Sequence, residues 1–458
     1  MPAPTDPPAS SPPPVAAGPA DPLAVIRSRG YLRILLLSGL IGIPVSAAAY
    51  GFLALVSWLQ KFLFTELPGV LGLDGVPVWW PLPLLALSGL LVALSIRYLP
   101  GNSGHSPSEG FKAGGFPSPA ELPGVALAAL ATLALGAVLG PEAPLIALGG
   151  GLGALALLLL KKDSPPSAVA VVAAAGSFAA VSTLLGSPLL GAFLLMEASG
   201  LGGAMLGVGL LPGLLAAGIG SLVFVGLDSW TGLGTFSLAI PDLPAFSTPT
   251  LAMFGWALVL GIVCPVLAWG IKAVSLLVRP AVHAHRLIVT PVLGLVVAAL
   301  AVGFAVITGE DSSQVLFSGQ SALPGLISDG AAWPVGALAL LVVFKALAYG
   351  LSLSAFRGGP VFPVMFLGAA LGIAAAQLPG MALVPAIGVG IGAMCVSMLR
   401  LPLTSVLLAT VLLTSDAAAV MPLVIVAVVV AHVLTARLPE PPGRGLSRKQ
   451  PAANVASG

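Results

Sequence analysis

The sequence predicts an all-α integral membrane protein, built as an inverted-repeat bundle of many tilted and broken helices. Of its 458 residues, 58% are hydrophobic and 7% are charged, and the mean hydropathy is +1.08. Soluble domains carry about 25% charged residues, so a soluble fold is excluded. The 57 glycines and 43 prolines cut the apolar runs into many pieces. Broken backbone at membrane depth persists only where it lines a cavity or is buried in protein. The pattern is therefore typical of a transporter or channel.

The apolar segments fall into two classes by length, because a spanning helix needs about 20 residues. Segments of spanning length are 32–64, 80–99, 122–139, 145–160, 203–226, 249–278, 287–308, 335–355 and 421–436. Segments too short to cross alone are 166–185, 189–197, 361–377, 383–397 and 403–414. The mixture predicts a bundle in which some helices stop partway through the bilayer.

Two internal similarities predict two membrane repeats, residues 23–230 and 231–437. Residues 144–153 resemble residues 363–372, and residues 187–195 resemble residues 401–409, in the same order and at nearly the same offset. Related halves with glycine and proline interruptions at matching places predict a binding site at their interface, near the middle of the membrane.

The ends of the chain differ from its centre. Residues 1–22 are rich in proline and alanine and predict a disordered tail, and residues 438–458 predict a polar tail. Basic residues flank the first and last spans: Arg27, Arg29, Arg33, Arg437, Arg444, Arg448 and Lys449. Basic flanks favour the cytoplasmic side, so we expect a multi-pass protein of the cell membrane with both termini in the cytoplasm.

The most informative residue is Glu142, in Gly140-Pro141-Glu142-Ala143-Pro144, with long apolar runs on both sides. An ionisable group at membrane depth costs at least about 2.5–3.5 kcal/mol on insertion scales, so it marks a pathway or has a partner. Because proline is tolerated in the first turn of a helix, Pro144 predicts that a helix begins near Glu142. Helix N-termini attract anions. A carboxylate placed there can occupy an anion site itself and leave it when protonated or displaced.

Four segments in this order resemble the CLC family of chloride channels and anion/proton exchangers, over residues 30–437. They are the possible filter segment 102–110, residues 140–144, residues 187–197 and residues 359–363. The resemblance implies a homodimer with one pore in each subunit, in which helix N-termini converge on chloride. It implies chloride or other small anions as ligands, the lipid bilayer as surroundings, and no cofactor.

The resemblance also implies roles for single residues. Glu142 would be the gate. The anion would be bound by the Ser103 hydroxyl beside Gly104, by the backbone near Ala143, and by the Val361 and Phe362 N–H groups after Gly359.

The segments depart from the family pattern at three prolines. In the filter segment the proline is Pro107, one place later than in the family, which leaves Ser106 as a second candidate ligand beside Ser103. Pro141 and Pro360 each remove one N–H donor.

Two departures bear on proton coupling. Exchangers of the family typically have a second glutamate after the one that aligns with Glu197, and here that position is Ala198. The family's tyrosine after the last span has no counterpart in residues 435–444. Alanine cannot carry a proton. The resemblance therefore favours passive chloride conduction gated by Glu142, with weak or no proton coupling.

Three further ionisable residues each allow two interpretations. Glu197 either accepts hydrogen bonds from backbone N–H groups of a broken helix or transfers protons. Lys345 either adds positive potential to the anion path or snorkels or pairs with a buried carboxylate. Arg357 either concentrates anions at the inner mouth of the pore or anchors the chain at the membrane interface.

Two other functions stay open at this point. One is a proton-coupled chloride or fluoride antiporter of the same fold. The other is a solute carrier with an unrelated inverted-repeat fold, in which Glu142 binds a cation. The sequence has no set of catalytic residues, no metal-ligand spacing and no phosphate-binding lysine after its glycine-rich run 149–153. We therefore expect no enzyme activity, no bound metal and no nucleic-acid partner.

Overall fold

A computed structural model of the protein describes residues 22–111, 115–199, 205–238, 243–246, 248–330, 332–413 and 417–442. Within these residues the regular structure is helical, and the only β-type pairing is an isolated bridge between Gly140 and Gly359. The two predicted tails lie almost wholly outside the described residues.

The helices follow the apolar segments of the sequence closely. The first part contains α1 (Pro22–Arg27), α2 (Arg29–Lys61), α3 (Leu67–Val70), α4 (Pro81–Tyr98), α5 (Leu122–Ala134), α6 (Glu142–Leu160), α7 (Pro166–Ala180), α8 (Pro188–Ser199) and α9 (Met205–Thr231). The second part contains α10 (Leu251–Ala284), α11 (Arg286–Thr308), α12 (Leu323–Ser328), α13 (Val335–Ala355), α14 (Val361–Ala376), α15 (Leu383–Leu399), α16 (Pro402–Val411) and α17 (Ala417–Arg437). Four short turns are η1 (Phe62–Glu66, π-helical) and the 3-10 turns η2 (Pro100–Ser103), η3 (Pro107–Glu109) and η4 (Ser312–Gln314).

One predicted span is wrong. The apolar run 122–139 is not one helix, because α5 ends at Ala134 and Gly136 adopts a left-handed backbone with φ of 101°. Residues 137–139 are nevertheless fully buried. Apolar character predicts burial, and it does not distinguish a helix from a buried irregular segment.

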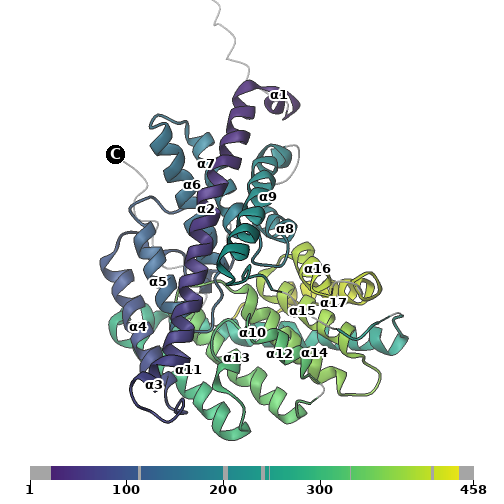
Figure 1. Cartoon of the computed structure of the whole chain (residues 1–458). Helices are drawn as coiled ribbons and strands as arrows, with labels where there is room; N and C mark the ends of the chain where they lie inside the picture. The colour runs from purple at the N-terminus through teal and green to yellow at the C-terminus, as the bar shows by residue number, and fades with distance from the viewer. Residues whose placement is uncertain are drawn as a thin grey trace, which may run out of the picture.

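Eight of the described helices are long and apolar enough to cross a membrane. The longest, α2 and α10, have 33 and 34 residues, which corresponds to about 50 Å at 1.5 Å per residue. A hydrocarbon core is about 30 Å thick, so both helices must tilt. Figure 1 shows α2 running along much of the height of the molecule. Its Leu36 and Leu40 are 57% and 64% exposed, as expected of a surface that faces lipid.

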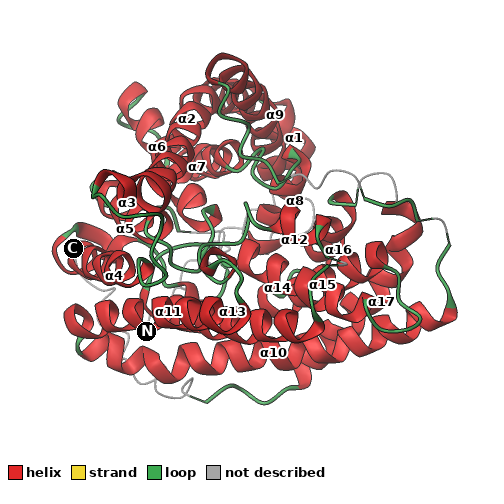
Figure 2. Ribbon diagram, turned by 60° about the horizontal axis from the view of Figure 1, so that its bottom comes forward, coloured by secondary structure: helices red, strands yellow, loops and turns green. Residues whose placement is uncertain are grey.

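The helices pack in the same pattern in the two parts of the chain. In the first part α2 packs on α7 and α9, and α6 packs on α7. In the second part α10 packs on α15 and α17, and α14 packs on α15. Figure 2 shows the first group on one side and the second group on the other. Because α9 ends at Thr231, the predicted boundary after residue 230 falls at the end of a helix; the division into repeats at that residue stays a prediction.

Glycines at matching positions allow the closest helix contacts in both parts. Gly149 and Gly153 of α6 lie against the backbone of α7, and Gly368 and Gly372 of α14 lie against the backbone of α15. These pairs occupy the same places in the two similar segments, five and nine residues after Pro144 and Pro363. A side chain at any of them would meet a backbone carbonyl oxygen of the neighbouring helix. Small residues let membrane helices approach closely where no hydrophobic driving force is available.

We expect Gly372→Ala to lower stability, although alanine favours a helix more than glycine does. The added methyl group would overlap the Ala386 carbonyl group. Overpacking of this kind costs about 1–3 kcal/mol, so the thermal unfolding midpoint of the purified protein should fall. Gly255→Ala is the matched control, because Gly255 in α10 has open space around it. Equal midpoints for the two variants would contradict the close packing of α14 on α15.

Candidate functional site

The two parts of the chain meet at a pair of glycines. The Gly140 N–H donates to the Gly359 carbonyl at 2.7 Å, and the Gly359 N–H donates to the Gly140 carbonyl at 2.6 Å. Each glycine is followed by a proline and then by a helix, α6 from Glu142 and α14 from Val361. The antiparallel bridge therefore holds two buried helix N-termini next to each other. Such termini have backbone N–H groups without partners inside the helix and carry partial positive charge.

The Glu142 carboxylate lies between these two helix starts. Its Oε1 accepts a hydrogen bond from the Phe362 N–H at 2.8 Å, and the residue is completely buried. Its Oε2 is buried without a hydrogen-bond partner and lies against Gly359. A side chain at Gly359 would overlap this oxygen, as would one at Gly140. The carboxylate at the start of α6 thus occupies the position in which the start of α14 would hold an anion.

Ser103 supplies an unpartnered hydroxyl near this position. Its side chain is 1% exposed, and its Oγ has no hydrogen-bond partner. Asn102 and Ser103 both adopt left-handed backbone, with φ of 51° and 54°, which is uncommon for residues other than glycine. Strained backbone of this kind often accompanies a functional site. Here it turns the chain so that a buried hydroxyl is left without an acceptor.

Several of the predicted residues line one cavity of about 60 Å³. Its lining includes Ser103, Gly104, Ser106, Pro107, Ala143, Arg357 and Pro360. Glu142, Val361 and Phe362 are not among its lining residues, and the Phe362 N–H is already bound by the Glu142 carboxylate. The predicted ligands therefore fall into two neighbouring groups. One group lines the cavity around Ser103, and the other is occupied by the Glu142 carboxylate.

The two candidate serine ligands differ in their contacts. The Ser106 Oγ shares a hydrogen bond of 2.8 Å with the Ser108 Oγ, whereas the Ser103 Oγ has none. A buried polar group without a partner costs about 1–3 kcal/mol. The contacts therefore favour Ser103 as the hydroxyl that binds an anion, and the role itself stays a prediction.

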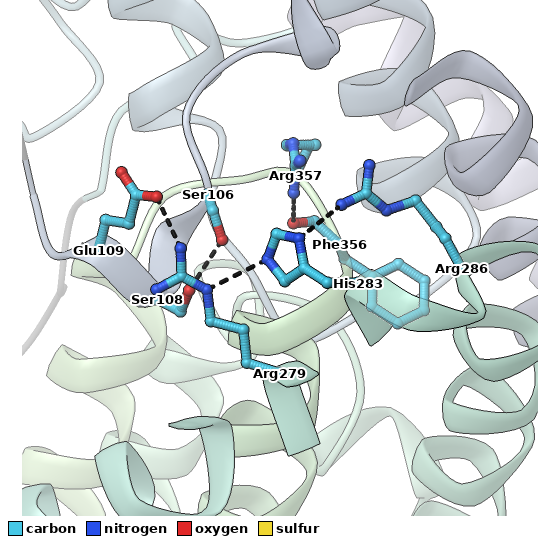
Figure 3. A network of polar contacts seen from close by, with 8 residues as sticks. All are labelled: Ser106, Ser108, Glu109, Arg279, His283, Arg286, Phe356 and Arg357. Carbon is cyan, nitrogen blue, oxygen red and sulfur yellow. Dashed lines mark hydrogen bonds and ion pairs between the residues drawn. The ribbon is translucent and has the colours of Figure 1, made fainter. Parts of the chain in front are cut away.

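Arg357 links residues 102–110 to the segment before α14. We call residues 102–110 the filter turn, after the family segment that they resemble. The Arg357 Nε donates to the Asn102 carbonyl at 3.3 Å. Figure 3 shows its second hydrogen bond, which Nη1 donates to the Phe356 carbonyl at 3.2 Å. The residue is 7% exposed and lines both the cavity beside Ser103 and a larger one next to it. This buried position beside the cavity is unlike that of an anchor in the membrane interface. It fits the interpretation that Arg357 attracts anions.

The interpretation of Lys345 as a snorkelling residue is wrong, and so is its interpretation as the partner of a buried carboxylate. Its side chain is completely buried, and its Nζ donates to three carbonyl groups, those of Gln314, Val315 and Leu316, at 2.8, 3.2 and 3.1 Å. The ammonium also lies 4.3 Å from the centre of the Phe366 ring. Lys345 lines neither of the two cavities at the filter turn. It fastens the loop after α11 to α13 and α14.

Glu197 connects two short helices, α8 in the first part of the chain and α16 in the second. Its carboxylate accepts hydrogen bonds from the Leu403 N–H at 3.0 Å, the Thr404 N–H at 2.7 Å and the Thr404 hydroxyl at 2.6 Å. It therefore caps the start of α16, which is the contact expected of the structural role. The adjacent Ala198 packs against the hydrophobic core.

Sequence reasoning missed Tyr349 in α13. Its side chain is completely buried, and its hydroxyl donates to the Pro360 carbonyl at 3.2 Å, at the turn that begins α14. The family resemblance placed its tyrosine after the last span, so Tyr349 was assigned no role. Tyr349 follows Lys345 by four residues, so helical spacing alone puts both on one face of α13 and could have drawn attention to it.

Comparisons of the sequence with known proteins agree with this geometry. The sequence model of the family described as "Voltage gated chloride channel" matches residues 89–436. A protein of Salmonella schwarzengrund (strain CVM19633) named "Putative ion-transport protein YfeO" is 31% identical over 353 residues, which cover 76% of this chain and 81% of that protein. The protein of the same name from Escherichia coli (strain SMS-3-5 / SECEC) is 30% identical over 359 residues, with 76% and 80% covered.

The fold is similar to those of solved transporters. A crystal structure of a slow cyanobacterial Cl⁻/H⁺ antiporter has a TM-score of 0.69 and 19% identity, with 91% of this chain and 97% of that chain covered. A CLC-type fluoride/proton antiporter has a TM-score of 0.59 and 19% identity, with 90% and 97% covered. A eukaryotic CLC transporter has a TM-score of 0.60 and 16% identity, with 89% and 72% covered. The predicted fold class is confirmed.

We expect Glu197→Gln to destabilise the protein while chloride flux persists. The amide keeps one oxygen and loses the charge that binds the start of α16, and a hydrogen bond to a charged group contributes about 1.5–3 kcal/mol. The thermal midpoint of the purified protein measures this loss. Glu66→Gln serves as the control, because Glu66 forms only an exposed ion pair with Lys61 at 3.5 Å. If the midpoint stayed constant and flux vanished, the capping role would be refuted.

Crystals of Glu142→Ala soaked in bromide should have anomalous density next to the Phe362 N–H and a second peak at the Ser103 Oγ. Without the carboxylate, the start of α14 lacks its acceptor, and a halide of the same charge can take its position. The unaltered protein should have density at Ser103 alone. A variant map without a peak at Phe362 would mean that this N–H group does not bind anions.

Proposed function

Because the chain belongs to the CLC family of voltage gated chloride channels and related transporters, we propose that it conducts chloride passively, with Glu142 as the gate and weak or no proton coupling. Anion transport across a membrane is the common activity of this family, which is not a class of enzymes. Membership also excludes the solute carrier of unrelated fold that the sequence left open.

The observation that carries the proposal is the position of the Glu142 carboxylate. The carboxylate is buried, and its Oε1 accepts a hydrogen bond from the Phe362 N–H. Its Oε2 has no hydrogen-bond partner. One carboxylate oxygen is thus well bound and the other is not, so the side chain is held only in part. A halide of equal charge competes for the same donors, and protonation of the carboxylate weakens its own hydrogen bond. When the carboxylate swings away, the donors around Ser103 and Phe362 form one continuous anion path.

The donors in this path suit an ion that must also leave. Backbone N–H groups and a hydroxyl bind anions weakly, whereas a fixed ammonium group beside the ion would hold it too tightly for rapid conduction. The Lys345 ammonium lies outside the cavity and is bound by three carbonyl groups, and the Arg357 guanidinium, which lines the cavity, donates to two. The site therefore combines selectivity for negative charge with easy release.

Two features support weak proton coupling. Ala198 cannot carry a proton from the inner side, and Glu197 is bound by three donors of the residues that begin α16. No tyrosine occurs in residues 350–458, so the inner gate of the family pattern lacks its usual side chain. The first feature removes a proton relay, and the second lowers the barrier to anions on the inner side.

The second candidate is a proton-coupled antiporter for chloride or fluoride. It is favoured by the names of two solved structures of similar fold, which are a Cl⁻/H⁺ antiporter and a fluoride/proton antiporter. The displaced proline of the filter segment, Pro107, is the feature of this chain that separates it from the usual chloride filter.

We further propose a homodimer in the cell membrane with both termini in the cytoplasm. Trp269 of α10 donates to the Pro439 carbonyl at 2.8 Å, and Pro441 lines a cavity together with Arg279 and Ser108. The end of α17 therefore lies on the same side as the basic residues around the filter turn. Basic residues favour the cytoplasmic side of a membrane. One orientation therefore puts both the end of α17 and these basic residues in the cytoplasm.

Flux from proteoliposomes tests the proposal. We expect chloride efflux that drives no uphill proton movement, with chloride and proton followed by electrodes in the same vesicles. Glu142→Gln should raise passive chloride flux about tenfold or more, because the lost charge-assisted hydrogen bond contributes about 1.5–3 kcal/mol. Uphill proton movement driven by a chloride gradient in the unaltered protein would refute passive conduction and establish the antiporter.

A further inference from the structure

A large basic cavity adjoins the cavity beside Ser103, and the mechanism above does not use it. We call it the basic vestibule. Its volume is about 810 Å³, and its lining includes Arg97, His105, Glu109, His283, His285 and Arg286. Three of the four histidines of the protein line it. Its one acidic lining residue, Glu109, is bound by Arg279 at 2.8 Å. Positive charge therefore dominates the vestibule.

The environment of His283 is unusual because two guanidinium groups flank its ring. The Arg279 Nε lies 3.3 Å from His283 Nε2, and the Arg286 Nη2 lies 3.4 Å from His283 Nδ1 (Figure 3). A guanidinium only donates hydrogen bonds, and a neutral imidazole accepts at one nitrogen only. At most one of these contacts is therefore a hydrogen bond, and at the other nitrogen an N–H group faces a donor. An anion between the two groups would accept from both.

Arg286 adds two further sets of donors at the same place. Its Nε is buried and has no hydrogen-bond partner. It is also the first residue of α11, a helix of 23 residues whose N-cap, His285, makes no side-chain capping bond. The N–H groups of Arg286 and Leu287 therefore lack a side-chain acceptor at the rim of the vestibule, whereas the Ile288 N–H donates to the His285 carbonyl at 3.0 Å.

We propose that the basic vestibule binds a multiply charged oxyanion of the phosphate class, with Arg286, His283 and the first turn of α11 as its donors. Guanidinium groups match the oxygen atoms of phosphate in pairs, which a spherical halide cannot provide. Helix N-termini bind phosphate groups through the same backbone donors. The vestibule is also far larger than the cavity of about 60 Å³ beside Ser103, so it admits a larger anion.

Binding there would regulate the pore. Gly104, His105, Ser106 and Arg357 line both cavities, so an oxyanion in the vestibule lies on the route to Ser103. Its charge would repel chloride from that route, and its size would block it. This consequence depends on the proposed chloride conduction, whereas the binding site itself does not.

The first experiment measures binding of inorganic phosphate to the full chain in detergent, by isothermal titration calorimetry at constant ionic strength. We expect saturable binding that weakens at least about tenfold in Arg286→Gln, because charge-assisted hydrogen bonds contribute about 1.5–3 kcal/mol. Arg97→Gln, on the facing helix α4, should also weaken binding and serves if Arg286→Gln does not fold. Arg33→Gln in α2 is the control and should bind as the unaltered chain does. Absence of saturable binding to both free phosphate and phosphatidic acid, or equal affinity in all folded variants, would overturn the proposal.

The second experiment measures chloride efflux from vesicles of neutral lipid with phosphate on one side only. We expect inhibition from the side of the vestibule, lost in Arg286→Gln and kept in Arg33→Gln. Vesicles that contain phosphatidic acid test a lipid headgroup as the source of the same oxyanion, and inhibition by that lipid alone would assign the site to lipid. If phosphate binds and no variant conducts chloride, the proposed function fails and the site stands. If chloride flows and phosphate binds without inhibiting it, the regulatory consequence is refuted.

Discussion

The structure depends on one constraint, the hydrogen-bonded pair of Gly140 and Gly359 that sets two buried helix starts beside each other. Backbone N–H groups buried in a membrane protein must find acceptors, because no water is available there. At this point one acceptor is the carboxylate of Glu142 at the start of α6, which binds the start of α14. The charge that is costly at membrane depth is thereby balanced by the partial charge of the helix starts. Removing the carboxylate would leave the partial charge of the helix starts without a counter-charge, and removing the helix starts would leave the carboxylate without one.

The same constraint explains where the chain must be glycine. Gly140 and Gly359 lie so close to the Glu142 carboxylate that neither has room for a side chain. Farther along the two helices, Gly149 and Gly368 let α6 and α14 lie directly on their neighbours. Close packing and the site are therefore parts of one arrangement, since the helix starts can face each other only if the helices behind them approach closely.

Two buried polar groups at the candidate site lack hydrogen-bond partners, whereas two ionisable residues outside it are fully bound. Glu197 and Lys345 are ionisable and at least partly buried, and each is fixed by three contacts. At the pore, by contrast, the Ser103 hydroxyl and one oxygen of Glu142 have no partners. Fully bound groups stabilise one conformation, whereas unbound ones can accept an exchanging ligand. The unpartnered atoms of Ser103 and Glu142 are therefore free to exchange with a ligand, although buried groups elsewhere, such as Ser38 and Thr290, also lack partners.

By itself, the sequence determined the class of protein, the positions of most helices and the importance of Glu142. Apolar length and proline placement are local properties, so helices such as α6 and α14 were predictable within a few residues. The failure at residues 135–139 shows the limit, because buried apolar residues need not be helical. The contacts of Lys345, the hydroxyl of Tyr349 at Pro360 and the basic vestibule were decided only by the tertiary structure. The vestibule brings together residues far apart in the chain, and Lys345 binds carbonyl groups 29 to 31 positions away. Tyr349 reaches Pro360 across the turn before α14. These contacts depend on how the helices pack, which no local pattern of residues encodes.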